Sequence, residues 1–251
     1  MITENNKKCA VIGAGVSGLA AAIRMRNKGY NVTVYEANAF AGGKLSSESC
    51  KGFRFDMGPS VFTMPQYVDE LFVLSGKNPK DYFNYIQLDP VYRYFFEDGT
   101  RVDSYHGKEA YAAEMSKIMS DSKERILKYL NHTEYVYHLT ADVFLHNSLH
   151  KLRNFFTKNV LKGLLNFGQI GAFETMNQAN EKAFADKKLV QIFNRYSTYN
   201  GSSPYLAPAT LNVIPHLEIM EGAYYPEGGM VAITEALLQL GKNLGISYCF
   251  S

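Results

Sequence analysis

Short apolar runs and one stretch of helical periodicity alternate along the first forty residues. Residues 9–12 form an apolar run that predicts a buried strand, and a glycine turn leads from it into a predicted helix over 17–28, which Gly29 ends. A second strand is predicted over 31–36. The chain therefore begins with a strand–helix–strand unit, which predicts an α/β fold.

The middle of the chain predicts one hairpin followed by helices. Residues 92–96 and 101–105, with Asp98-Gly99 between them, indicate two strands joined by a short turn. Charged and apolar residues then recur at three- and four-residue spacing from 109 to about 145, and the pattern stays mostly helical over 160–195.

Prolines mark the end of this helical region. Three of them lie within 201–215, which predicts a connection that returns to the first domain. A last helix is predicted over 230–243, and a strand begins near Tyr248.

Composition and charge exclude several classes of protein. The chain has 251 residues, 46% hydrophobic and 20% charged, with a formal charge of +2, so it is globular and lacks the basic field that non-specific nucleic-acid binding needs. Cys9, Cys50 and Cys249 show no C-x-x-C spacing, which argues against disulfides or zinc and fits a reducing compartment. No apolar run reaches the roughly 18 residues of a transmembrane helix.

The turn after the first strand carries a G-x-G-x-x-G motif, Gly13-Ala14-Gly15-Val16-Ser17-Gly18. The first glycine allows a tight turn, the second lets a pyrophosphate approach the backbone, and the third lets helix and strand pack closely. The helix N-terminus adds unpaired N–H groups and a positive dipole end. A chance glycine turn is the alternative, but the strand and helix on either side favour a dinucleotide site.

Glu36 ends the second strand, where a carboxylate can accept hydrogen bonds from both ribose hydroxyls of an adenosine. Its charge would repel a 2′-phosphate, which disfavours NADP, whereas NAD and FAD fit equally well. Gly42-Gly43-Lys44 and the segment 52–60 favour a larger cofactor, because they allow close backbone approach and a positive contact. Taken alone, the two glycines also fit a flexible loop and Lys44 a solvated charge.

Together, these features resemble the N-terminal half of the FAD-dependent amine oxidase and phytoene desaturase superfamily. The residues that carry the resemblance are 13–18, Glu36, Gly42-Gly43-Lys44 and Phe55-Asp56-Met57-Gly58-Pro59. Segments 199–208, 216–225 and 226–230 resemble, more narrowly, the bacterial-type phytoene desaturases that make coloured carotenoids. Lys44 departs from the family, which more often has arginine there. An ammonium group can still contact the cofactor, but it lacks the bidentate fork of a guanidinium group.

The resemblance implies a Rossmann-like FAD-binding domain of GR2 type with an inserted, mixed α+β substrate domain, truncated at the C-terminus. The implied parts are 1–75 for the FAD-binding domain, 76–215 for a substrate and membrane-associated domain, and 216–251 for an incomplete return to the FAD-binding domain. The residues implied to bind FAD are Gly13, Ala14, Gly15, Val16, Ser17, Gly18, Glu36, Ala37, Gly43, Lys44, Gly58, Pro59 and Ser60, with the last three near the flavin ring.

The implied reaction is desaturation of a carotenoid, phytoene or a later intermediate, by hydride transfer from an allylic carbon to flavin N5. A flavin amine oxidase is the more distant alternative. A non-catalytic flavin-binding fragment is another, because a sheet that lacks strands exposes edges and apolar surface. The catalytic base stays unknown, since Arg93, Asp103 and Glu221 fit solvated hairpin or loop charges better.

Two further sets of residues have competing interpretations. Seven aromatic residues are compatible with an apolar tunnel for a polyene or with ordinary core: Tyr82, Phe83, Tyr85, Tyr92, Tyr94, Phe95 and Phe96. Four histidines lack the H-E-x-x-H motif that would indicate zinc, so we expect no metal: His132, His138, His146 and His150.

Residues 145–167 are the candidate membrane contact. On a helix, Lys151, Lys158 and Lys162 would lie opposite the apolar side chains, and the stretch 143–173 contains no acidic residue. A helix packed on the domain core explains the pattern equally well. We expect a cytoplasmic protein that acts on a carotenoid, without a nucleic-acid partner, and that is peripheral on the inner face of the cell membrane if this segment binds lipid.

Overall fold

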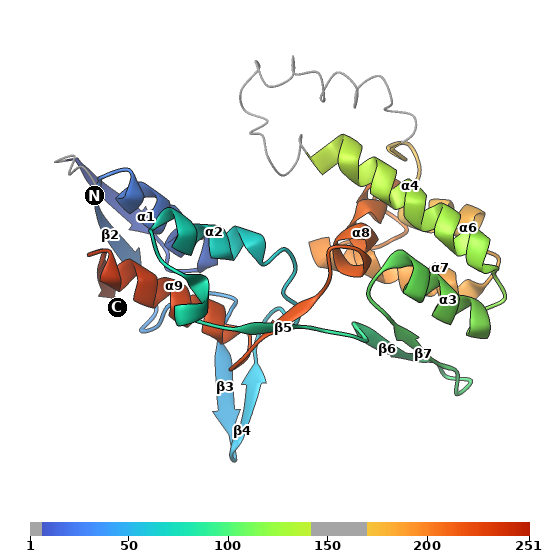
Figure 1. The fold of residues 1–251 in the computed structure, drawn as a ribbon, viewed down its shortest axis with the longest axis horizontal. Helices are drawn as coiled ribbons and strands as arrows, with labels where there is room; N and C mark the ends of the chain where they lie inside the picture. Colours follow the sequence, from blue (N-terminus) through green and yellow to red (C-terminus); the bar gives the residue numbers. More distant parts are fainter. Residues whose placement is uncertain (1–6, 142–169) are drawn as a thin grey trace. The chain divides into compact units, whose positions relative to one another are not determined.

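The computed structural model describes residues 7–141 and 170–251, which divide into two compact units (Figure 1). The first unit comprises residues 1–88 and 223–251, and the second comprises residues 89–222. Both boundaries lie later than the expected 75/76 and 215/216. The reason is that β5 (Tyr85–Gln87) pairs with β8 (Tyr224–Pro226), which keeps both segments in the first unit.

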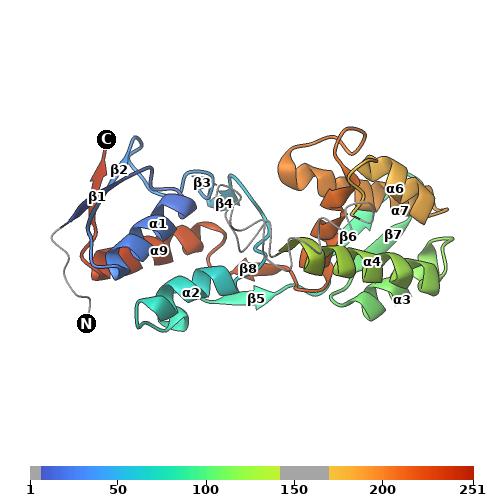
Figure 2. The ribbon, with the colours of Figure 1, turned by 90° about the horizontal axis from the view of Figure 1, so that it is seen from above.

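A three-stranded parallel sheet forms the base of the first unit. Its strand order is β1 (Lys8–Ile12), β2 (Asn31–Glu36) and β9 (Ser247–Phe250). Helix α1 (Val16–Asn27) connects β1 to β2, and α9 (Val231–Asn243) precedes β9. Figure 2 shows α1 and α9 side by side next to these strands. The strands and helices predicted at both ends of the chain are thus confirmed within one or two residues.

The core of the first unit lies between this sheet and the two helices. Leu19 and Ile23 of α1 and Leu237 of α9 are fully buried, and Val34 of β2 packs in the same cluster. The other face of the sheet is open, with Ile12 90% exposed in this chain. Parallel sheets are commonly covered on both faces, so this exposure matches the expectation of apolar surface on the sheet.

Several elements of the first unit were not predicted, among them a hairpin and a helix. An antiparallel hairpin joins β3 (Ser47–Cys50) to β4 (Phe53–Asp56), and α2 (Gln66–Leu74) follows. Seven of the eight hairpin residues are exposed, so the strands lack the apolar alternation that a half-buried strand would show. The Lys51-Gly52 turn, in which both residues have positive φ, was the available signal.

The second unit combines one hairpin with short helices. The hairpin pairs β6 (Tyr92–Phe95) with β7 (Arg101–Ser104), as predicted. The described α-helices are α3 (Lys108–Ile118), α4 (Lys123–Ala141), α6 (Met176–Ala183), α7 (Lys187–Asn194) and α8 (Ile214–Ile219). One 3₁₀ helix, Arg195–Asn200, precedes the proline-rich region, and a second, Ala209–Val213, lies within it. None of the described helices is long and apolar enough to cross a membrane.

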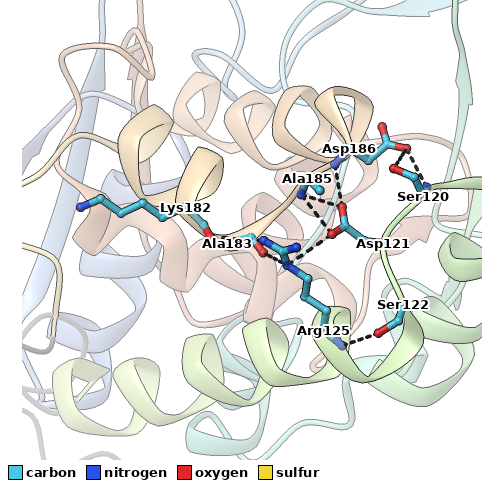
Figure 3. Close-up of polar contacts among 8 residues, drawn as sticks. All are labelled: Ser120, Asp121, Ser122, Arg125, Lys182, Ala183, Ala185 and Asp186. Carbon is cyan, nitrogen blue, oxygen red and sulfur yellow. Dashed lines mark hydrogen bonds and ion pairs between the residues drawn. The ribbon is translucent and has the colours of Figure 1, made fainter.

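The helical pattern over 109–145 does not reveal that the chain turns between α3 (Lys108–Ile118) and α4 (Lys123–Ala141). The buried carboxylate of Asp121 accepts hydrogen bonds from Ala185 N at 3.0 Å and Asp186 N at 2.8 Å (Figure 3). Asp186 in turn accepts the N–H of Ser120 at 2.8 Å, and Arg125 Nε lies 3.3 Å from Asp121. The α3–α4 turn and the α6–α7 turn therefore lock each other, which local periodicity cannot predict.

We expect Asp121→Ala to lower the free energy of unfolding by about 1–3 kcal/mol, because it leaves two partly buried N–H groups without an acceptor. Glu124→Gln, on the first turn of α4, is the control and changes stability by less than about 0.5 kcal/mol. Urea unfolding followed by circular dichroism measures both variants. Equal stability of the two variants would contradict the interlock.

The aromatic residues considered for a tunnel are divided between the units, so they form no single cluster within either one. Tyr82, Phe83 and Tyr85 belong to the first unit, where Phe83 and Tyr85 have ring centroids 5.6 Å apart. The other four lie on or just after β6 in the second unit, and Phe95 is 65% exposed there. Alternation along β6 explains the exposure of Phe95, since Tyr94 faces inward and Phe95 outward.

Candidate functional site

The glycine turn after β1 lies against the loop that follows β2. Gly13 N donates to Tyr35 O at 2.7 Å, and Gly42 N donates to Ala14 O at 2.9 Å. Gly13 and Gly42 have φ of +96° and +123°, conformations that only glycine adopts readily. The two glycine motifs of the sequence therefore meet at the carboxyl end of the sheet, where ligands bind in open α/β folds.

Close packing accounts for two of the glycines implied by the resemblance. A Cβ atom on Gly18 would lie 2.0 Å from Gly13 O, and one on Gly58 would lie 1.8 Å from Lys44 O. Both distances are far below van der Waals contact, so the backbone requires glycine at each position. The Gly58 contact places the segment after β4 directly on the Lys44 loop.

Gly15 is the one glycine of the motif that the protein itself does not explain. Its φ is −66°, which any residue adopts, and a Cβ there would meet no protein atom within 4 Å. It precedes the first turn of α1, whose N–H groups have no partner within the helix. A side chain at this position would fill room that an anionic group needs to reach those N–H groups, so the local geometry fits the pyrophosphate of a dinucleotide.

Glu36 stands beside the glycine turn at the end of β2. Its Oε2 accepts Ala14 N at 2.7 Å, and its Oε1 accepts the backbone N–H of Asn38 at 3.0 Å and the Asn38 side-chain amide at 2.7 Å. These bonds, chiefly the one from Ala14, lower the pKa of Glu36 below its ordinary value. The carboxylate is therefore ionised at neutral pH and is held against the glycine turn.

A cavity of about 420 Å³ opens at the glycine turn and the Lys44 loop, and Glu36 is not among its lining residues. Of the predicted residues, five line it: Gly15, Val16, Ser17, Lys44 and Pro59. Gly43 also faces Gly15, since a Cβ on Gly43 would lie 3.5 Å from Gly15 Cα, whereas Ala37 and Ser60 are exposed and outside the lining. The opposite wall includes Phe62, Met230 and Ile233, which sequence reasoning did not assign. Pro226-Glu227-Gly228-Gly229 before α9 was the signal that could have pointed to Met230.

The polar residues considered as a catalytic base have structural partners. Arg93 and Asp103 form a two-bond ion pair across the β6–β7 hairpin, at 2.6 and 2.8 Å, with 57% of the Arg93 side chain exposed. Glu221 Oε1 lies 3.7 Å from Nε2 of His216, which is nearly fully buried. All three residues belong to the second unit. They fit the solvated or structural interpretation, and no base is assigned.

The described residues contain no cluster of three or more metal-ligating side chains. His132 and His138 lie on α4, whereas His146 and His150 fall outside the described residues, as does segment 145–167. His138 contacts a different histidine, His216 of α8, with ring centroids 5.8 Å apart.

His216 predicts a pH dependence of stability for the second unit. Burial lowers the pKa of His216, although Glu221 and Glu134 oppose the shift. The unfolded chain therefore binds a proton that the folded chain rejects, so stability falls as pH drops below the ordinary pKa of about 6.5. His216→Phe, which keeps the stacking on Tyr137, is expected to flatten this part of the pH profile in urea titrations between pH 5 and 8. Exposed His132→Gln serves as the control, and an unchanged slope in His216→Phe would contradict the assignment.

Comparison with known proteins finds relatives along nearly the whole chain. The chain is 43% identical to 1-hydroxycarotenoid 3,4-desaturase of Flavobacterium sp. (strain P99-3), over 97% of this chain and 50% of the relative. It is 34% identical to 4,4'-diapolycopene oxygenase of Methylomonas sp, over 98% of this chain and 49% of the relative. The chain thus spans about half the length of the curated relatives it matches.

Solved structures agree with this fold. Cyclohexylamine oxidase from Brevibacterium oxydans IH-35A superposes with a TM-score of 0.61 at 15% identity, over 98% of this chain and 51% of the neighbour. At this identity, the likeness concerns the fold alone. The model of the family of flavin-containing amine oxidoreductases matches residues 16–248, so the chain belongs to that family, with FAD as the cofactor.

Proposed function

We propose that this protein is the part of an FAD-dependent carotenoid oxidoreductase that binds the adenosine diphosphate portion of the cofactor, and that the reaction is desaturation of a carotenoid. The observation that carries the proposal is the 43% identity to a 1-hydroxycarotenoid 3,4-desaturase along 97% of the chain. The fold likeness to an amine oxidase, at 15% identity, does not support amine chemistry. Phytoene and later, more unsaturated carotenoids both fit the substrate class.

Each group at the site has a separate task in this proposal. The N–H groups of the first turn of α1 bind the pyrophosphate through the space at Gly15, and ionised Glu36 accepts the ribose hydroxyls. Lys44 adds one positive charge to the cavity wall. When bound, FAD supplies the two-electron acceptor that removal of hydrogen from a CH–CH bond requires. The protein contributes binding, orientation and exclusion of water.

Expression in a host that accumulates carotenoids tests the reaction. Desaturation removes two hydrogens and lengthens the conjugated system, so we expect products lighter by two mass units or multiples of two, with absorption at longer wavelength. A Glu36→Ala variant, which loses the proposed ribose contact, is the matched control. Pigments identical to those of the empty host would count against catalysis by this chain and favour the non-catalytic flavin-binding alternative.

A second reaction is favoured by one observation, the 34% identity to a diapolycopene oxygenase. Oxygenation and desaturation start from the same class of substrate and differ in the mass change of the product. A gain of an oxygen atom in mass spectra of the same extracts would select oxygenation. A loss of hydrogen alone would select desaturation.

We further propose a cytoplasmic location with peripheral attachment to the inner face of the cell membrane through residues 145–167. The support is the run of basic residues without acidic ones and the lipid solubility of the proposed substrate. Flotation with anionic liposomes tests attachment, with Lys151, Lys158 and Lys162 replaced together by glutamine. Equal flotation of the two proteins would contradict this proposal.

A further inference from the structure

Two side chains of β4 and one of β8 form a hydrogen-bonded group in the first unit. Asp56, at the end of β4, accepts Arg54 Nη1 at 3.0 Å through Oδ1. Its Oδ2 accepts the Tyr225 hydroxyl at 2.6 Å and Met230 N at 3.2 Å. We name Arg54, Asp56 and Tyr225 the β4 clamp. It ties the hairpin strand to β8 and to the residue that begins α9.

The charges of the clamp are complementary. Burial alone would raise the pKa of Asp56, but the hydrogen bonds from Tyr225 and Met230 N and the charge of Arg54 outweigh burial and lower it. The pKa of Tyr225 is raised, mainly by its hydrogen bond to Asp56. The Tyr225 hydroxyl therefore stays protonated and donates a hydrogen bond to Asp56. Asp56 is an ionised carboxylate with three donors, so these hydrogen bonds are charge-assisted, and the one from the Tyr225 hydroxyl is short at 2.6 Å.

The guanidinium of Arg54 lies directly on the backbone of the turn before α9. A Cβ atom on Gly229 would lie 2.0 Å from Arg54 Nη1 and 2.2 Å from Nη2. At Gly228, the nearest atom to a Cβ would be the Ala232 Cβ, at 3.8 Å. The two glycines have similar φ, +86° and +89°. A side chain at either position is therefore strained to a similar degree, but only one at 229 displaces Arg54.

Two residues next to the β4 clamp, Met230 and Pro59, line the cavity. Met230, held through its N–H by Asp56, lines the cavity, and so does Pro59, which follows Asp56 along the chain. Gly58, which lies between Asp56 and Pro59 in the sequence, packs on the backbone of Lys44. Lys44 also lines the cavity. Asp56 is therefore connected to two parts of the cavity wall, to Met230 through a hydrogen bond and to Pro59 along the chain.

We propose that the β4 clamp is a positioning device for flavin binding, which sets FAD affinity by holding Met230 and Pro59 at the cavity although its own side chains do not line it. The proposal rests on the placement of FAD in this cavity, as argued under the proposed function. Arg54 is the central residue of this proposal, because its guanidinium contacts both the Asp56 carboxylate and the Gly229 backbone.

The glycine pair supplies the test. The FAD dissociation constant of the 251-residue chain is measured by flavin fluorescence titration for the wild type, Gly228→Ala and Gly229→Ala, together with melting temperatures without FAD. We expect Gly229→Ala to weaken FAD binding about tenfold relative to Gly228→Ala, about 1.4 kcal/mol. In an Arg54→Ala background, the two alanine variants are expected to bind FAD equally, because the displaced side chain is gone.

The carboxylate is tested separately. Asp56→Asn is expected to weaken FAD binding and to change the absorption bands of bound flavin, whereas Glu48→Gln, an exposed carboxylate on the same hairpin, leaves both unchanged. Equal FAD affinities for Gly228→Ala and Gly229→Ala would overturn the clamp proposal even if Gly229→Ala melts at a lower temperature. A wild-type chain that binds no FAD would overturn the placement of the cofactor as well, so the two failures are distinguishable.

Discussion

Replacing Arg195 by methionine is expected to lower the free energy of unfolding of the second unit by about 3–5 kcal/mol. Glu218 is fully buried, and its Oε1 accepts Arg195 Nη2 at 2.7 Å and the Tyr196 hydroxyl at 2.8 Å. Its Oε2 accepts the Tyr199 hydroxyl. Removal of Arg195 leaves a buried carboxylate without its counter-charge, and it also removes a cation that stacks 4.3 Å from the ring centroid of Tyr92.

The size of this effect depends on which partner is removed. In the double variant Arg195→Met with Glu218→Gln, the buried charge is gone and the amide oxygen can still accept a tyrosine hydroxyl. We expect this variant to be more stable than Arg195→Met alone, because breaking a buried pair costs more than replacing both members. Arg93→Met, whose partner Asp103 lies on the exposed hairpin, should cost less than about 1 kcal/mol.

Hydrogen exchange of peptides from α7 and α8, combined with urea unfolding, measures these differences within the second unit. Exchange is preferred because the two units can unfold separately, and a single transition would then average them. A double variant less stable than Arg195→Met would show that the carboxylate stabilises this unit in some way other than by pairing with Arg195.

Gly15→Ala is expected to weaken FAD binding by roughly tenfold to a hundredfold while leaving the FAD-free chain almost as stable as the wild type. The added methyl group meets no protein atom within 4 Å, and the φ of −66° is acceptable for alanine. It would, however, hold the pyrophosphate away from the N–H groups of α1, which loses charge-assisted hydrogen bonds worth about 1.5–3 kcal/mol. The N-cap preference for glycine over alanine costs up to about 1 kcal/mol. The lower entropy of the unfolded chain with alanine offsets about 0.4–1 kcal/mol of this cost.

Gly18→Ala is the matched comparison for this experiment. Its Cβ would lie 2.0 Å from Gly13 O, so the variant should lose stability without FAD as well as affinity for FAD. Thermal melts with and without FAD, together with fluorescence titration, separate the two cases. Gly15→Ala binding FAD as tightly as the wild type would place the pyrophosphate elsewhere.

Local patterns along the chain determined the start of the first unit. The apolar runs and the glycine turn predicted β1, α1 and β2 within one or two residues, because these elements depend on interactions over a few positions. The same patterns gave distinct reasons for Gly13 and Gly18, which their geometry matches. They failed at Asp121, where a carboxylate that looks like an ordinary turn residue is held by N–H groups more than sixty positions away.

The candidate site divides in the same way. The sequence by itself predicted the fingerprint residues, Glu36 and Lys44 as site residues, since each belongs to a motif with a recognisable spacing. Only the tertiary structure decided that Asp56 bonds Met230, 174 residues further along the chain, and that Arg54 excludes a side chain at Gly229. Contacts of this kind depend on where the chain returns after the second unit. Interactions between sequence neighbours do not fix that position, so local patterns cannot predict these contacts.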